Sequence, residues 1–207
     1  MCAGKMAEVY DLTGRFAPII VNMKLDLCDL VIRKLDWEDV IPDNLRHIWV
    51  SHIEMIKEIS KVRFKRAVIP PDAISLDINT INTGDASQNV ACAAIYVRFL
   101  RKCRSYSCEL IFARTKLLIE GITQPRAELT AAVLNTHTGE VVRRALSKYH
   151  KQSTMLTDSK IVLCWINNMN IALKQWTRCR VVEIHRFTDP NSWLLVKSGD
   201  MVADLGT

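Results

Sequence analysis

The order of strand and helix patterns constrains this chain more than any single residue does. After the Pro70-Pro71 pair, which interrupts the chain, three strand-like segments follow one another with no helical pattern between them. They cover residues 74–83, 90–100 and 108–117. The second is the clearest, because it has the two-residue period of a strand with one buried face.

Helix and strand patterns alternate in the rest of the chain. The expected segments are a helix over 126–147, a strand over 154–157, helices around 161–166 and over 176–185, a strand over 193–196, and a helix that starts at Met201. Three consecutive strands followed by alternating helices and strands are typical of an α/β layered domain.

The region before the two prolines shows helical rather than strand periodicity. Apolar residues recur at helical spacing over 18–35, and Asp43 is expected to cap a second helix that extends to about residue 59. The sequence therefore predicts a small helical region over 1–70 and an α/β domain over 71–207.

Composition limits the cellular setting. No apolar run is long enough to cross a membrane, and the N-terminal residues lack the apolar core of a signal peptide. Seven cysteines without a CxxC pair indicate reduced thiols rather than a disulfide framework. We therefore expect an intracellular protein, cytoplasmic or nuclear, that is not secreted. Its formal net charge of +6 suits a polyanionic partner, although ordinary solvated basic faces would give the same excess.

Four acidic residues lie in separate short motifs at the expected element boundaries. They are Asp85 in GDAS, Glu128 in PRAEL, Asp158 in LTDSK and Asp204 in MVADLGT. Taken singly, each is most simply a turn residue, a helix cap or a surface charge. Taken together, they would end the first and fourth strands and begin the first and last helices of the α/β domain. If those two strands are neighbours, the four side chains meet at one edge of the sheet.

Clustered carboxylates repel one another unless a cation neutralises them, and Mg²⁺ prefers hard oxygen ligands of this kind. A pair of such ions activates water and stabilises the leaving oxygen of a phosphodiester. The four acids thus favour a metal-dependent nuclease.

The residues around these acids resemble a known family. The stretches GDASQNVACAAIYVRF, ELIFARTKLLIEGITQPRAELTAAVL, LTDSKIVLCWI and WLLVKSGDMVADLGT are similar to the ribonuclease H region of BEL/Pao-type retrotransposon polyproteins. The N-terminal stretch YDLTGRFAPIIVNMKLDLCDLVIRKLDWEDVIPDNL resembles the connection-like segment that follows the polymerase palm in those polyproteins. This resemblance implies a ribonuclease H-like five-stranded mixed sheet with flanking helices, preceded by a small helical region.

The resemblance also implies an activity. The four acids would be catalytic residues that hold two Mg²⁺ (or Mn²⁺) ions and hydrolyse the RNA strand of an RNA–DNA hybrid. Arg126 and Arg180 fall on positions that are basic in the family and would contact the nucleic-acid backbone. A solvated helix face explains both arginines equally well. The implied partners are the hybrid and the upstream polymerase domain of the same polyprotein, with no membrane.

One departure from the family leaves the activity open. Ribonuclease H domains usually place a histidine before the last aspartate, and the corresponding residue here is Leu195. His185 is the nearest histidine upstream, and a structural role is favoured for it. The alternatives are a catalytically weak or inactive nucleic-acid-binding fragment of a degenerate retroelement, a non-functional relic, or a nuclease from another branch of the same fold.

Overall fold

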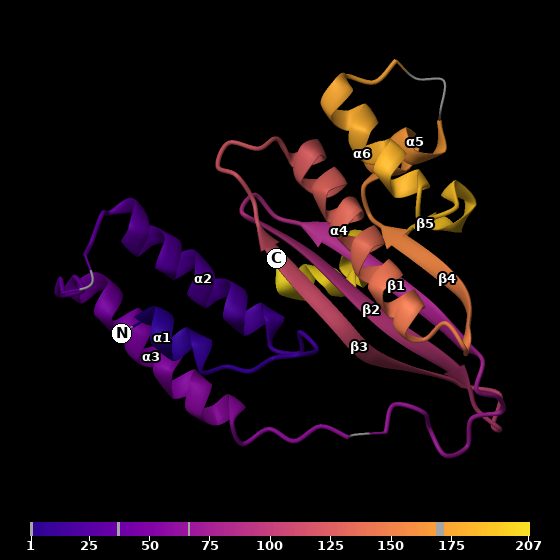
Figure 1. Cartoon of the computed structure of the whole chain (residues 1–207), viewed down its shortest axis with the longest axis horizontal. Coiled ribbons are helices and arrows are strands. Elements are labelled where there is room, and N and C mark those ends of the chain that lie inside the picture. The colour runs from indigo at the N-terminus through magenta and orange to yellow at the C-terminus, as the bar shows by residue number, and fades with distance from the viewer. Residues whose placement is uncertain (1, 37, 66, 169–171) are drawn as a thin grey trace.

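A five-stranded mixed sheet forms the centre of the computed structural model, which describes residues 2–36, 38–65, 67–168 and 172–207. Its strands are β1 (Ile78–Ala86), β2 (Val90–Leu100), β3 (Tyr106–Leu117), β4 (His150–Thr157) and β5 (Trp193–Leu195). The spatial order is β3-β2-β1-β4-β5. The first three strands form an antiparallel meander, whereas β4 runs parallel to β1, and β5 runs parallel to β4 (Figure 1). The α/β layered architecture expected from the sequence is therefore confirmed.

Three helices cover one face of this sheet. They are α4 (Gln124–Ala145), α5 (Lys160–Asn167) and α6 (Gln175–His185). In Figure 1, α4 crosses in front of β1 and β2, and α5 and α6 lie beside its upper half. The buried residues that join these helices to β4 and β5 form the largest cluster of the core: Leu129, Ala132, Met155, Val162, Ile166, Val181, Ile184 and Trp193.

The middle of α4 carries a His-Thr-Gly sequence that is unfavourable for a helix, yet the helix is continuous there. Gly139 faces β1 so closely that an added Cβ would overlap the side-chain nitrogen of Asn82. Nε2 of His137 lies 2.6 Å from Oε1 of Glu183 on α6. The hydroxyl of Thr138 donates to the carbonyl of Leu134 at 2.6 Å. The contacts of Gly139 with β1 and of His137 with α6 thus offset the weak local helix propensity.

The opposite face of the sheet is covered in part by the chain's last turn. The short 3-10 helix η3 (Val202–Gly206) packs on β1 and β2, and it lies behind the sheet in Figure 1. Cys92 of β2, Met201 and Ala203 are buried together there. Gly206 sits directly over Cys92, and an added Cβ would lie 3.2 Å from the Cys92 Cβ and closer still to its sulfur.

The N-terminal helices lie beside β3 and have a cluster of their own (Figure 1). They are α1 (Cys2–Ala7), α2 (Ala17–Ile32) and α3 (Asp43–Ile59). Cys2, Leu30, Leu45 and Trp49 are buried between them. Helix α2 also contacts β3 and η3, so this helical group is attached to the sheet. No helix in the described part of the chain is long and apolar enough to cross a membrane.

The loop before α2 makes the attachment specific. The carboxylate of Asp11 accepts hydrogen bonds from the backbone nitrogens of Arg15 and Phe16, at 3.0 and 2.7 Å. The carbonyl of Thr13 accepts a hydrogen bond from the backbone nitrogen of Ala113 in β3, at 2.8 Å. Gly14 follows with φ +73°, against the backbone of the same Ala113. The outer edge of β3 is therefore paired at this point.

Several expected boundaries were wrong. Strand β1 begins at Ile78 rather than near residue 74, because Ser75 forms a side-chain turn with the nitrogen of Asp77 just before it. The strand also extends past residue 83, and Asp85 is a strand residue paired with Cys92. β4, in contrast, begins four residues earlier than expected, because its pairing with β1 starts near residue 150.

Two helix ends also differ from expectation. Asp43 is the first residue of α3, with Pro42 in the cap position and no side-chain cap. The last helix is a 3-10 turn rather than an α-helix.

The attachment predicts a local stability effect. In Gly14→Ala the new Cβ would lie 2.6 Å from the carbonyl carbon of Ala113, and the positive φ would be strained as well. We expect a loss of about 2–3 kcal/mol in the free energy of unfolding, measured by urea titration. Gly121→Ala is the matched control, because Gly121 has φ +76° and no atom within 4 Å of an added Cβ. The control should lose only about 1 kcal/mol from backbone strain. Equal losses in the two variants would contradict the close approach.

Candidate metal centre

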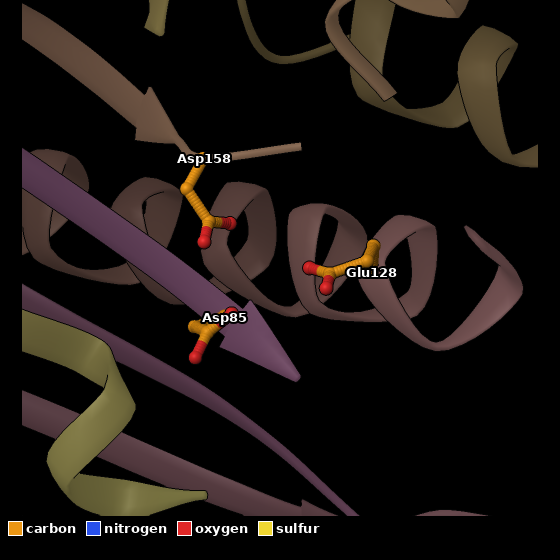
Figure 2. A group of neighbouring side chains, drawn as sticks. All are labelled: Asp85, Glu128 and Asp158. Atoms are coloured by element: carbon orange, nitrogen blue, oxygen red, sulfur yellow. The ribbon is translucent and has the colours of Figure 1, made fainter. Parts of the chain in front are cut away.

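Three of the four acids meet at one edge of the sheet. Asp85 is the penultimate residue of β1, Asp158 follows β4 directly, and Glu128 lies in the second turn of α4. One carboxylate oxygen from each lies within 4.8 Å of the others. Figure 2 shows the three side chains turned toward a common space. The two aspartates meet because β1 and β4 are parallel neighbours whose carboxyl ends share an edge.

Small residues bring Glu128 to the two aspartates. An added Cβ on Gly84 would lie 2.8 Å from the Cβ of Asn135 in α4 and 3.1 Å from the carbonyl oxygen of Ala131. One turn closer to the site, alanines fill the interface between the helix and the strands: Ala86, Ala91, Ala127 and Ala131. The helix therefore approaches β1 closely at the turn that carries Glu128.

Asp204 lies beside this group but outside it. It is exposed on η3, and its carboxylate is not among the three that meet within 4.8 Å. The hydroxyl of Thr207 lies 3.5 Å from Oδ2 of Asp85 and 3.5 Å from Oδ1 of Asp204. The charge of Asp204 contributes to the raised pKa of Asp85, so the two carboxylates interact electrostatically.

Two neighbouring side chains orient the carboxylates, and sequence reasoning missed both. The side-chain nitrogen of Gln124 donates to Oε1 of Glu128 at 2.7 Å and to the carbonyl of Ala86 at 2.8 Å. The hydroxyl of Ser198, after β5, donates to Oδ2 of Asp158 at 2.7 Å. Gln124 was detectable, because it lies four residues before Glu128 on the same helix face. Ser198 had no such signal, since it is 40 residues from its partner.

Burial and mutual repulsion disfavour the charged forms of two of these carboxylates, Glu128 and Asp85. Burial, with smaller contributions from Asp85 and Asp158, raises the pKa of Glu128 to about 7, even though the hydrogen bond from Gln124 lowers it. Burial and the charges of Asp158 and Asp204 raise the pKa of Asp85. Among the described residues, no lysine, arginine or histidine forms an ion pair with any of the four acids.

The surroundings of one Glu128 oxygen indicate whether a cation fits between the three carboxylates. Oε2 of Glu128 is buried and has no hydrogen-bond partner in the described structure, whereas Oε1 is held by Gln124. A buried unpaired carboxylate oxygen is costly unless a ligand satisfies it. Together with two aspartates at the same point, it forms the all-oxygen set that a hard divalent cation prefers. The residues present therefore fit a divalent metal ion.

The two arginines singled out in the sequence also come together. Arg126 of α4 and Arg180 of α6 both lie against the ring of Trp176, with their guanidinium carbons 5.1 and 3.5 Å from its centroid. Both helices thus present a positive charge close to the helical turn that carries Glu128.

Leu195 lies beside Asp158, whereas His185, the nearest upstream histidine, is hydrogen-bonded elsewhere. Leu195 pairs with Thr157 in the ladder between β4 and β5, one residue before Asp158, and its side chain is 41% exposed. His185 is bound elsewhere: its Nε2 lies 2.9 Å from the carbonyl oxygen of Ile166 and joins the ends of α6 and α5.

The raised pKa of Glu128 predicts how stability depends on pH. Its folded-state pKa is about 7 and its ordinary value is 4.5. The stabilisation by the protonated carboxyl is therefore complete below the ordinary value and is lost as pH rises through about 7. In metal-free buffer we expect Glu128→Gln to remove this decline, as measured by urea unfolding between about pH 5 and about pH 8.

Adding Mg²⁺ to the same unfolding measurement tests whether a cation relieves the repulsion. It should restore the stability of the unmutated protein at the upper pH and have little effect on Glu128→Gln. Glu109→Gln, at an exposed position on β3, is the control and should behave like the unmutated protein. A pH profile that is unchanged in Glu128→Gln would contradict the electrostatic strain described above.

One known protein family shares the sequence pattern of this chain. A family model described as "Pao retrotransposon-like RNaseH-like domain" matches residues 1–159, which include Asp85, Glu128 and Asp158 but not Leu195 or Asp204. No curated protein sequence matches the chain significantly.

Among solved structures, the RNase H domain at the N-terminus of a Mycobacterium tuberculosis protein is 13% identical, with a TM-score of 0.40. That comparison covers 62% of this chain and 89% of the other. An RNase H1 isolated from compost is 15% identical over 63% of this chain and 91% of its own, with a TM-score of 0.42. A foamy viral protease-reverse transcriptase is 10% identical over 88% of this chain and 31% of its own, also with a TM-score of 0.42.

The family match spans most of the 207 residues, and the five-stranded mixed sheet with its flanking helices has the expected ribonuclease H-like form. The chain therefore belongs to the Pao retrotransposon-like family of RNaseH-like domains.

Proposed function

We propose that this retrotransposon domain hydrolyses the RNA strand of RNA–DNA hybrids in a metal-dependent reaction. The observation that carries the proposal is the meeting of Asp85, Glu128 and Asp158 within 4.8 Å, where no lysine, arginine or histidine of the described residues forms an ion pair with them. A domain that only bound nucleic acid would gain nothing from keeping mutually repelling acids in its core.

The metal set is Asp85, Glu128, Asp158 and Asp204, and the ions are two Mg²⁺ (or Mn²⁺). When bound, such a pair supplies an activated water and stabilises the leaving 3′-oxygen of the phosphodiester. Asp85, Glu128 and Asp158 hold the cluster, and Asp204 contributes from the open side, where it is exposed. Gln124 and Ser198 fix the orientation of Glu128 and Asp158, which leaves the remaining carboxylate oxygens free to bind.

Arg126 and Arg180 bind the backbone of the hybrid. Neither arginine is in an ion pair with a carboxylate among the described residues, so both charges are available. Selection of the RNA strand rests on its 2′-hydroxyls across the shallow minor groove.

The N-terminal helices serve as a connection to an upstream polymerase domain of the same polyprotein. Residues 1–70 form this helical unit, and residues 71–207 form the ribonuclease H-like domain. The separate cluster around Trp49 supports this division. An intracellular location accompanies this proposal, and it is supported by seven cysteines that are all free thiols.

A second candidate function rests on Leu195. An exposed leucine occupies the strand end beside Asp158, where the family usually places a histidine that helps to release product. In this alternative the domain binds hybrids but cleaves them weakly or not at all.

Hybrid cleavage tests the first function. We expect the purified protein to cut the RNA strand of a labelled hybrid with Mg²⁺ or Mn²⁺, as seen on a denaturing gel. Asp85→Asn should lower the rate by at least about a hundredfold, because it removes a ligand from the centre of the cluster. Glu109→Gln is again the control and should cleave normally. A folded protein that leaves the hybrid intact with both metals would exclude the enzyme.

Leu195→His separates the two functions. A histidine at this strand end would lie beside Asp158 and act as the missing helper, so turnover should rise several-fold in a steady-state assay if the cluster is competent. Leu194→His, at the neighbouring exposed position on the alternate face of β5, should give no increase. No increase from Leu195→His in an otherwise inactive protein would favour the binding function.

A further inference from the structure

Trp176 is the residue on which Arg126 and Arg180 converge. The guanidinium carbon of Arg180 lies 3.5 Å from the ring centroid, and that of Arg126 lies 5.1 Å from it. A cation over an aromatic face is attracted by the partial negative charge of that face. Two cations at one ring also repel each other, so the arrangement is best satisfied when an anion joins them.

The ring is itself firmly placed. Trp176 is partly buried and packs against the large core cluster between α4, α5 and α6. Nη1 of Arg180 donates to the carbonyl oxygen of Trp176 at 3.0 Å, which fixes that guanidinium over its own helix. The nearest acid along α6, Glu183, is turned toward α4, where its Oε1 lies 2.6 Å from Nε2 of His137. The two guanidinium groups therefore keep their charge and have a fixed support.

The position of the ring relates it to the carboxylates. Arg126 and Glu128 are two residues apart on α4, so their side chains leave the helix about 200° apart. One turn of helix thus presents Glu128 to the metal centre and Arg126 to α6. The separation is about one helix diameter, roughly 10 Å.

We propose that Trp176 is a positioning residue that holds Arg126 and Arg180 together as a single phosphate clamp, on the side of α4 that faces α6 rather than the carboxylates. The clamp rests on the proposed function for its ligand, the sugar-phosphate backbone of a hybrid. Its action is to fix where the two charges lie, because flexible arginines on separate helices would otherwise bind phosphate independently and lose side-chain entropy on binding.

Binding without cleavage tests the clamp. All variants are made in the Asp85→Asn background, and their affinity for a short fluorescent RNA–DNA hybrid is measured in EDTA over a range of salt concentrations. Trp176→Leu keeps both arginines, yet we expect several-fold weaker binding and a smaller slope of log K against log salt. The slope should fall by about 0.7–0.9, the value for one lost phosphate contact. Trp176→Phe retains an aromatic face and should restore most of both quantities.

Two matched controls separate positioning from stability and from total charge. Trp165→Leu removes a tryptophan that packs against the same core cluster, but no arginine lies over that ring among the described residues. It should lower the free energy of unfolding without changing the salt slope. Arg178→Gln removes an exposed charge from the same helix and should weaken binding less than Arg126→Gln does.

A double variant tests whether the two parts act together. Once Trp176 is replaced by leucine, Arg126→Gln should cost markedly less affinity than it does alone. Additive losses, an equal salt slope in Trp176→Leu and Trp165→Leu, failure of Trp176→Phe to restore binding, or no salt-dependent binding by the Asp85→Asn protein would each overturn the clamp. If the clamp is found and the unmutated protein cleaves no hybrid, the proposed catalysis fails and the clamp stands.

Discussion

The close approach of α4 to the first strand is the contact on which the rest of the site depends. Gly84 and the surrounding alanines remove side-chain bulk between helix and strand, so that the helical turn carrying Glu128 lies against the strand end carrying Asp85. A larger residue at Gly84 would push the helix outward, because its Cβ would meet Asn135 and the helix backbone. Packing of small groups in the interior thus determines the distance between charged groups at the edge.

That geometry places charges where water alone cannot stabilise them well. Glu128 is half-buried with one oxygen unpaired, and Asp85 is more buried still. Other buried polar atoms in the described structure also lack a hydrogen-bond partner, among them the side-chain oxygens of Asn82 and Asn135, but Glu128 is the one carboxylate in that group. Local strain of this kind is typical of functional sites, where a ligand restores the balance.

Much of the sheet was predictable because its signals are local. The bounds of β2 were predicted as observed, although both faces of its first half are buried and burial alternates between successive residues only in its second half. The start of β1 was not, because the turn at Ser75 and the pairing partner opposite Asp85 are decided by contacts with other segments. Local motifs located all four acids, and their element order predicted that the four would meet at one edge of the sheet, where three of them come within 4.8 Å of one another.

The remaining parts of the site depend on tertiary structure. Ser198 reaches Asp158, and Trp176 collects two arginines, only after the crossover helices have packed. Ser198 stands in no pattern with Asp158 along the chain, whereas Trp176 lies four residues before Arg180 on α6, and only its contact with Arg126 depends on the packing of two helices. Asp204 was placed correctly near the last turn, but the structure puts it beside the cluster, on an exposed 3-10 helix, rather than within it.

The pairing of Thr13 with Ala113 has a consequence for how this domain can be separated from its neighbours. It fills hydrogen-bonding positions at the outer edge of β3, which would otherwise be an open template for another strand. A fragment that begins at residue 71 would keep every acid of the metal centre and yet lose this cover, together with the contact of α2 on β3 and η3. Such a fragment would be prone to edge-to-edge aggregation. The N-terminal helices thus protect the edge of the sheet, and the unit that stays monomeric is larger than the α/β domain alone.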